Sequence, residues 1–90
     1  VRILDYGGDT GNNAPFENQR KLLHVYDIGH RQVVKGAVKI DKAKMRVTRY
    51  DLIVCANVLE HVSYPADVLN EIVPLMDKDT ILYVEVPFEG

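Results

Sequence analysis

A glycine-rich loop follows the first apolar run of the chain and is joined to it by one acidic residue, Asp5. Residues 1–4 are mostly apolar, and residues 6–11 read Tyr-Gly-Gly-Asp-Thr-Gly. Glycines at the end of a strand let backbone amides approach a ligand closely, because no Cβ stands in the way. The carboxylate of Asp5 would repel a pyrophosphate but would attract a cationic ligand. The loop therefore predicts a binding site for a ligand that carries positive charge.

A second acid, Asp27, lies near the end of the next apolar run, residues 22–28. An acid at the end of the second strand can accept hydrogen bonds from ribose hydroxyls. The dinucleotide fingerprint G-x-G-x-x-G is absent: Gly8 and Gly11 keep its last interval, but Tyr6 stands where the first glycine should be. The two acids thus favour a cationic, ribose-bearing ligand, and the loop spacing disfavours an NAD(P)-binding oxidoreductase.

A third candidate is the pair Glu60 and His61, which follows the apolar run at residues 51–56. A histidine has an unperturbed pKa of about 6.5 and can take a proton from an acceptor hydroxyl. A purely structural use of His61 is the alternative. Both interpretations remain open at this point.

These residues must be positioned by strands that alternate with helices. Apolar runs predict strands at residues 1–5, 22–28, 51–56 and 80–86, and shorter ones at 33–34 and 37–40. Prolines at first helical positions predict helices at 15–23 and 65–73, and Pro74 is expected to end the second. No amphipathic helix is expected within residues 30–50. The alternation predicts an α/β sheet of parallel strands.

Composition excludes several other classes of protein. Ninety residues allow one domain at most, residues 1–90. Eleven Lys and Arg against thirteen Asp and Glu leave no basic excess for a nucleic-acid partner. No apolar run reaches the ~18 residues that span a bilayer, so no membrane partner is expected. The single cysteine, Cys55, fits a reducing, cytoplasmic compartment and a place in the core, whereas His24 and His30 are expected to be exposed.

Four segments together resemble the class I S-adenosylmethionine-dependent methyltransferases. They are residues 3–11, 25–28, 50–62 and 82–87, with the sequences Ile-Leu-Asp-Tyr-Gly-Gly-Asp-Thr-Gly, Val-Tyr-Asp-Ile, Tyr-Asp-Leu-Ile-Val-Cys-Ala-Asn-Val-Leu-Glu-His-Val and Leu-Tyr-Val-Glu-Val-Pro. They occur in the family's order and cover nearly the whole chain, with residues 30–49 poorly matched. The resemblance implies a Rossmann-like, doubly wound, mostly parallel sheet. The family has seven strands, and this chain has room for about five, in the order 3-2-1-4-5.

The resemblance also implies a cofactor, S-adenosylmethionine, and a role for each matching residue. Asp5 would lie near the cofactor's ammonium group, and Asp27 would hold the ribose hydroxyls. Asp41 is the candidate for the adenine amino group. The remaining cofactor-binding residues implied by the resemblance are Gly7, Gly8, Gly11, Ala56 and Asn57. Ala56 and Asn57 would border the methionine and the transferring methyl group, and His61 is the candidate catalytic base.

Three positions depart from the family's pattern. Asp9 stands where the family commonly has glycine, and Asp-Lys-Asp-Thr at 77–80 replaces its usual Lys-Pro-Gly-Gly turn. Some relatives bind a divalent metal through Glu-x-x-Glu-His, but here Asn57 occupies the first position. The two remaining ligands make a poor site for a hard cation. No metal site is therefore expected.

The function that these observations predict is methyl transfer from S-adenosylmethionine to a small-molecule acceptor, sugar-related compounds included. One alternative is a non-catalytic or incomplete fragment of a methyltransferase fold that still binds the cofactor. The shortness of the chain favours it, whereas the motifs favour the enzyme. An NAD(P)-binding oxidoreductase domain is the third hypothesis, disfavoured by the loop spacing and by Asp5.

Overall fold

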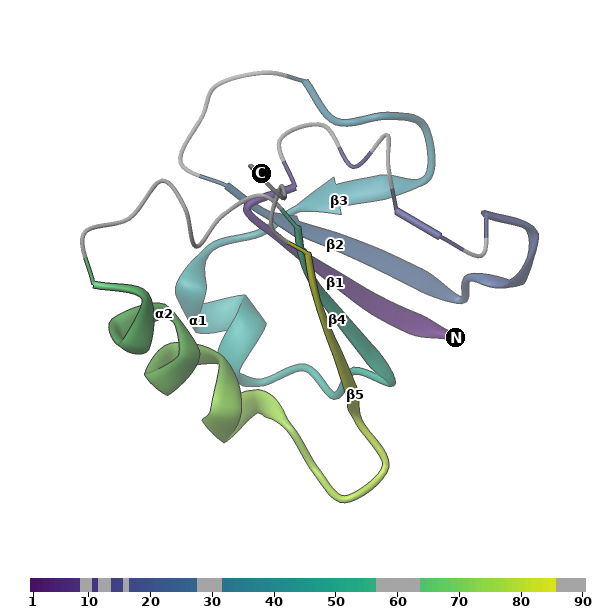
Figure 1. Ribbon diagram of the computed structural model, residues 1–90. Helices are drawn as coiled ribbons and strands as arrows, with labels where there is room; N and C mark the ends of the chain where they lie inside the picture. Colours follow the sequence, from purple (N-terminus) through teal and green to yellow (C-terminus); the bar gives the residue numbers. More distant parts are fainter. Residues whose placement is uncertain (9–10, 12–13, 16, 28–31, 57–63, 86–90) are drawn as a thin grey trace, which may run out of the picture.

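The computed structural model describes residues 1–8, 11, 14–15, 17–27, 32–56 and 64–85. Within these ranges, five strands form one sheet (Figure 1). The strands are β1 Arg2–Tyr6, β2 Leu22–Tyr26, β3 Ala37–Lys39, β4 Leu52–Ala56 and β5 Ile81–Glu85. All neighbouring pairs are parallel and the order is β3-β2-β1-β4-β5. The predicted Rossmann-like α/β fold and strand order are thereby confirmed.

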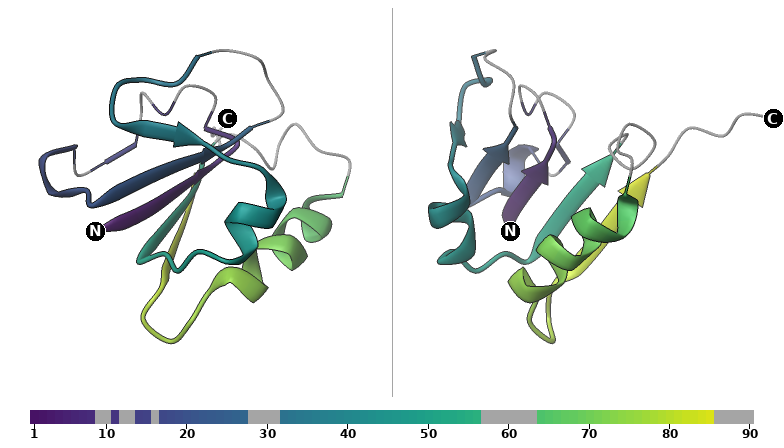
Figure 2. Two further views of the ribbon diagram at one scale, coloured as in Figure 1. Left: turned by 180° about the vertical axis from the view of Figure 1, so that it is seen from behind. Right: turned by 90° about the vertical axis from the view of Figure 1, so that its left-hand side faces the viewer.

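Two helices cover one face of this sheet, α1 Lys42–Arg46 and α2 Pro65–Ile72 (Figures 1 and 2). Successive side chains of a strand point to opposite faces, so each strand contributes to two separate clusters. The cluster on the helical side comprises Leu4, Tyr6, Met45, Tyr50, Ile53, Cys55 and Ile72. The cluster on the opposite side comprises Ile3, Leu23, Val25 and Val54. The central strands are thus buried on both faces, which explains their continuous apolar sequences.

The second helix begins and ends where its prolines predict. Pro65 occupies the first turn, and α2 passes into the short 3-10 helix η3 Val73–Leu75, which contains Pro74. A proline cannot donate the backbone hydrogen bond that a continuing α-helix requires. Ile72 is fully buried under the sheet, whereas the next residue, Val73, is 58% exposed.

Three predicted elements were wrong. The helix at 15–23 is replaced by the 3-10 helix η1 Glu17–Gln19 and by β2, because Leu22 and Leu23 pair with β1. Residues 33–34 form no strand; the Val34 carbonyl accepts from the Ala37 amide in a turn at Gly36. Conversely, the unpredicted α1 lies within residues 30–50.

Helix α1 forms around a cap and one buried side chain. The Asp41 carboxylate accepts a hydrogen bond from the Lys44 amide at 2.9 Å, which satisfies a free donor of the first turn. Met45 is the single buried residue of the helix. One apolar contact in five residues leaves no periodicity to recognise, which explains why the sequence did not reveal this helix.

A polar network joins β1, β4 and β5 at their amino ends. Arg49 contacts Asp51 at 2.6 Å and Asp77 at 3.0 Å, and the second Asp51 oxygen accepts from the Arg2 amide at 2.9 Å. The Arg2 guanidinium donates in turn to the Arg49 carbonyl at 2.8 Å. These contacts hold the edge of the sheet that lies opposite the glycine loop.

The helices in the described part of the chain lack the length and hydrophobicity that a membrane span requires.

His24 is buried, contrary to the expectation that it is exposed. Only 4% of it is accessible, and its Nδ1 lies 2.7 Å from the Tyr50 hydroxyl. Alternation along β2 directs this side chain toward the helical face, where Tyr50 meets it. Burial, with the positive charges of Lys44 and Arg2, lowers the pKa of His24 below its usual 6.5.

Stability should therefore depend on the protonation of His24. Because the folded-state pKa lies below the unfolded one, the unfolded chain binds more protons as the pH falls below about 6.5. This contribution to the free energy of unfolding is complete above that pH and is lost on acidification. Urea unfolding at pH 7.5 and 5.5 measures how much the free energy of unfolding falls on acidification. This loss should be smaller for His24→Gln than for the wild type. Equal losses in the two proteins would contradict this assignment.

Candidate functional site

Asp5 is a buried carboxylate near the carboxyl end of the central strand. It precedes the last residue of β1, pairs with Val25 of β2 and Val54 of β4, and is 4% exposed. Burial raises the pKa of Asp5 from 3.8 to about 6, and the negative charge of Asp27 acts in the same direction. The sheet thus holds a destabilised negative charge at its centre, which a cationic ligand would stabilise.

Gly8 folds back over this carboxylate. A Cβ added to Gly8 would overlap the Asp5 carboxylate carbon and both of its oxygens. Only a residue without a side chain therefore lets the loop lie against the acid in this way. The sequence predicted that these glycines let a ligand approach the backbone closely, and this stays a prediction. In the structure, the group that lies against Gly8 is the Asp5 carboxylate.

Gly7 and Gly11 are held by backbone hydrogen bonds to β2 and to Gly8, respectively. The Gly7 amide donates to the Tyr26 carbonyl at 2.7 Å, and the Gly11 amide donates to the Gly8 carbonyl at 2.9 Å. Gly7 and Gly11 have φ angles of 71° and 81°, in the region that favours glycine. A Cβ on Gly11 would also come within 2.9 Å of a Val25 methyl group. Gly7 and Gly11 thus serve the turn, and Gly8 serves the approach to Asp5.

Asp27 directly follows β2 and lies close enough to Asp5 for its charge to act on that group. Since β1 and β2 are neighbours in parallel register, the two acids meet at the same edge of the sheet. This is the edge where open parallel sheets bind ligands. The structure therefore brings together Asp5, Asp27 and the glycine loop.

The other predicted residues are less closely associated. Asp41 lies beyond the end of β3 and caps α1, so one of its oxygens is engaged by the Lys44 amide. Ala56 is the last residue of β4 and reaches the same edge of the sheet. Asn57 and His61 lie outside the described residues, as does Glu60. Among the described residues, no three His, Cys, Asp or Glu side chains could jointly hold a metal ion.

Tyr6, Tyr26 and Glu71 are neighbours at this edge to which the sequence assigned no role. The rings of Tyr6 and Tyr26 lie 5.3 Å apart on the helical face, below the start of the glycine loop. Tyr6 directly follows the first predicted strand and Tyr26 lies near the end of the second, which could have indicated this pairing. The negative charge of Glu71, on α2, adds to the effect of burial in raising the pKa of Tyr6, and nothing in the local sequence of Glu71 distinguishes it from a surface acid.

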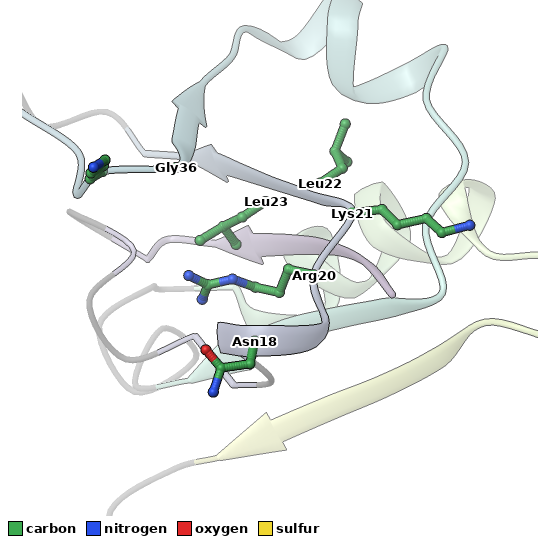
Figure 3. A pocket seen from close by; sticks show the side chains of 7 residues that line it. Asn18, Arg20, Lys21, Leu22, Leu23 and Gly36 are labelled. Carbon is green, nitrogen blue, oxygen red and sulfur yellow. The ribbon is translucent and has the colours of Figure 1, made fainter.

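A pocket of about 350 Å³ lies at the opposite end of the sheet, where β2 and β3 begin (Figure 3). It is lined by Asn18, Arg20, Lys21, Leu22, Leu23, Lys35 and Gly36. The Arg20 and Lys21 side chains point in different directions (Figure 3), and Arg20 donates to the Ala14 carbonyl at 3.2 Å. This pocket contains no predicted site residue, and its Arg20 and Lys21 side chains do not converge.

Comparison with known proteins identifies one family. Over residues 1–90, the chain matches the family model described as a methyltransferase domain. No curated protein and no solved structure matches the chain significantly.

Proposed function

Because the chain belongs to this methyltransferase domain family, we propose that it transfers a methyl group from S-adenosylmethionine to a small-molecule acceptor. The observation that carries the choice of cofactor is the pair Asp5 and Asp27 beside a glycine loop at the carboxyl ends of adjacent strands. The ammonium group of the cofactor would compensate the buried charge of Asp5. The ribose hydroxyls would donate hydrogen bonds to the Asp27 carboxylate.

The residues present fit such a ligand. The close packing of Gly8 on Asp5 and the raised pKa of Asp5 support a site for a cationic group, because perturbed carboxylates cluster at functional sites. In the proposed arrangement, Asp5 holds the ammonium group, Asp27 the ribose and Asp41 the adenine amino group. Ala56 and Asn57 border the methionine portion of the ligand.

S-adenosylmethionine, when bound, supplies a methyl group that its sulfonium makes electrophilic. The chain's own contribution is to bind and orient the ligand and to exclude water, which can lower the barrier by several kcal/mol. An acceptor hydroxyl would also need a base to take its proton, and His61 is our candidate for this base. A small-molecule acceptor is the partner that we propose.

The Asp27→Ala variant should bind S-adenosylhomocysteine more weakly by about 1–3 kcal/mol, because charge-assisted hydrogen bonds to the ribose are lost. Calorimetric titration measures this difference. Asp79→Ala provides the matched control, since Asp79 is an exposed acid in the turn before β5 and should bind as the wild type does. Unchanged affinity in a folded Asp27→Ala variant would remove Asp27 from the site.

Titration with two ligands and an assay for turnover distinguish the candidate functions. Binding of S-adenosylhomocysteine together with methyl transfer to a panel of small molecules supports the proposal. Binding without turnover favours a non-catalytic or incomplete cofactor-binding unit. Binding of NADH alone would support an oxidoreductase domain instead.

A further inference from the structure

Charge is divided unevenly along the chain. Residues 1–50 contain ten Lys and Arg and five Asp and Glu, whereas residues 51–90 contain one Lys and eight Asp and Glu. The sheet turns this division of the sequence into a division in space, because β1, β2 and β3 come from the first part and β4 and β5 from the second (Figure 1). One side of the sheet is therefore built from a basic sequence and the other from an acidic one.

The acidic side reaches the candidate site at the ends of β4 and β5. Ala56, which is proposed to border the methionine portion of the ligand, is in register with Glu85, the last residue of β5. Asp5 pairs with Val54, two residues before Ala56. Because side chains alternate along a strand, Asp5 and Glu85 belong to the same face of the sheet. They thus lie on either side of β4, near the edge where the ligand would bind.

Glu85 is available to a ligand at this edge. Its side chain is exposed, and among the described residues none forms an ion pair with it. The sequences of β4, α2 and β5 contain no Lys or Arg, whereas α2 adds the acids Asp67 and Glu71. Charges of one sign lining a site attract ligands of the opposite sign and repel those of the same sign. The β4 and β5 side of the site therefore favours a cationic molecule.

The surroundings of Glu85 also suit a small molecule. Tyr83 lies two residues earlier on the same face of β5 and is 51% exposed. An exposed aromatic ring can pack against an apolar or cyclic group and attract a cation. The strands of Asp5 and Glu85 are two strand spacings apart, roughly 10 Å. This separation leaves room for an acceptor beside the group that Asp5 is proposed to hold.

We propose that the methyl acceptor is a small molecule with an ammonium group, and that Glu85 selects it by accepting a hydrogen bond from that group. This inference rests on the proposed function and names the substrate class of the same site. Glu85 holds the charged group of the acceptor and takes no part in the transfer of the methyl group. Acceptors that carry a carboxylate or a phosphate would be repelled.

The first test compares acceptors that differ in the charge of one group. Glucosamine, glucose and glucuronate form one series, and tyramine, para-ethylphenol and para-hydroxyphenylacetate form another. Within a series, kcat/KM for methyl transfer should be about tenfold higher for the ammonium compound than for the neutral one. Where a series shows no turnover, calorimetric binding to the protein saturated with S-adenosylhomocysteine gives the same comparison. No difference within the series, or a preference for the anionic compounds, would overturn the inference and leave the proposed function intact.

The second test assigns the preference to Glu85. Glu85→Gln should lower kcat/KM for the ammonium compound about tenfold, through KM, with wild-type affinity for S-adenosylhomocysteine. Glu85→Lys should reverse the preference in favour of the anionic compound. Asp79→Asn is the matched control, since it removes the same charge from the exposed turn before β5 and should keep the wild-type preference. An unchanged preference in Glu85→Gln would overturn the role of Glu85. Failure of the wild type to bind S-adenosylhomocysteine would overturn the proposed function as well.

Discussion

Gly8→Ala is expected to weaken binding of S-adenosylhomocysteine at least about a hundredfold, the largest effect of any substitution in the loop. The added Cβ would overlap the whole Asp5 carboxylate group. That side chain is short and buried, so either the acid turns away or the loop lifts from it. Either change removes the contact that Asp5 is proposed to make with the ligand's ammonium group, and the loss of a hydrogen bond to a charged group costs up to about 3 kcal/mol, roughly a hundredfold in affinity. Overpacking should also lower the free energy of unfolding by about 1–3 kcal/mol.

Gly36→Ala separates this steric effect from the general cost of replacing a glycine. Gly36 has a φ of 87°, and a Cβ there would meet no atom within 4 Å. The left-handed backbone should cost about 1–2 kcal/mol of stability, with no change in ligand affinity. Calorimetric titration and urea unfolding on both variants give the comparison. Wild-type affinity in Gly8→Ala would show that the ligand does not depend on the contact between the loop and Asp5.

Asp5→Asn is expected to stabilise the free protein and to weaken ligand binding in the same molecule. The folded-state pKa of Asp5 is about 6, above its unfolded value of 3.8. Its contribution to stability is therefore complete below about pH 3.8 and is lost as the pH rises through 6. At pH 8 the charged acid destabilises the fold, and the neutral amide should raise the free energy of unfolding by about 1–3 kcal/mol. The gain should shrink toward pH 4.

Affinity should change in the opposite direction, because the amide cannot compensate the ligand's ammonium charge. We expect Asp5→Asn to bind S-adenosylhomocysteine about ten- to a hundredfold more weakly at pH 8. The wild type should bind more tightly as the pH rises from 5 to 7.5 and Asp5 ionises, whereas the variant should lack this increase. Titrations across this range, with urea unfolding in parallel, measure both effects. A variant that is less stable and binds equally well would contradict the assignment of Asp5.

The major elements of the fold could be predicted from the sequence. The runs that became β1, β2, β4 and β5 are apolar along most of their length, and their observed bounds differ from the prediction by at most two residues. Strands buried on both faces carry this signal locally. Pro65 and Pro74 likewise determine where α2 begins and where it changes into η3.

Short elements could not be predicted, because tertiary contacts decide them. Leu22 and Leu23 suit the end of a helix as well as the start of a strand. Pairing with Arg2 and Ile3 selects the strand. Helix α1 depends on the Asp41 cap and on Met45 reaching the core. His24 was expected at the surface because its partner, Tyr50, lies 26 residues away in the sequence.

The candidate site, like the fold, could be predicted from the sequence only in part. Residue type and spacing by themselves predicted that Asp5 and Asp27 lie at the ends of successive strands and that a glycine loop comes directly after β1, since turns and strand ends are local features. Only the packed structure decided that Gly8 covers the Asp5 carboxylate, that the pKa of Asp5 rises to about 6, and that the charge of Glu71 on α2 acts on the pKa of Tyr6. These properties arise from exclusion of water and from the approach of distant charges, and neither exists until the sheet and α2 have come together.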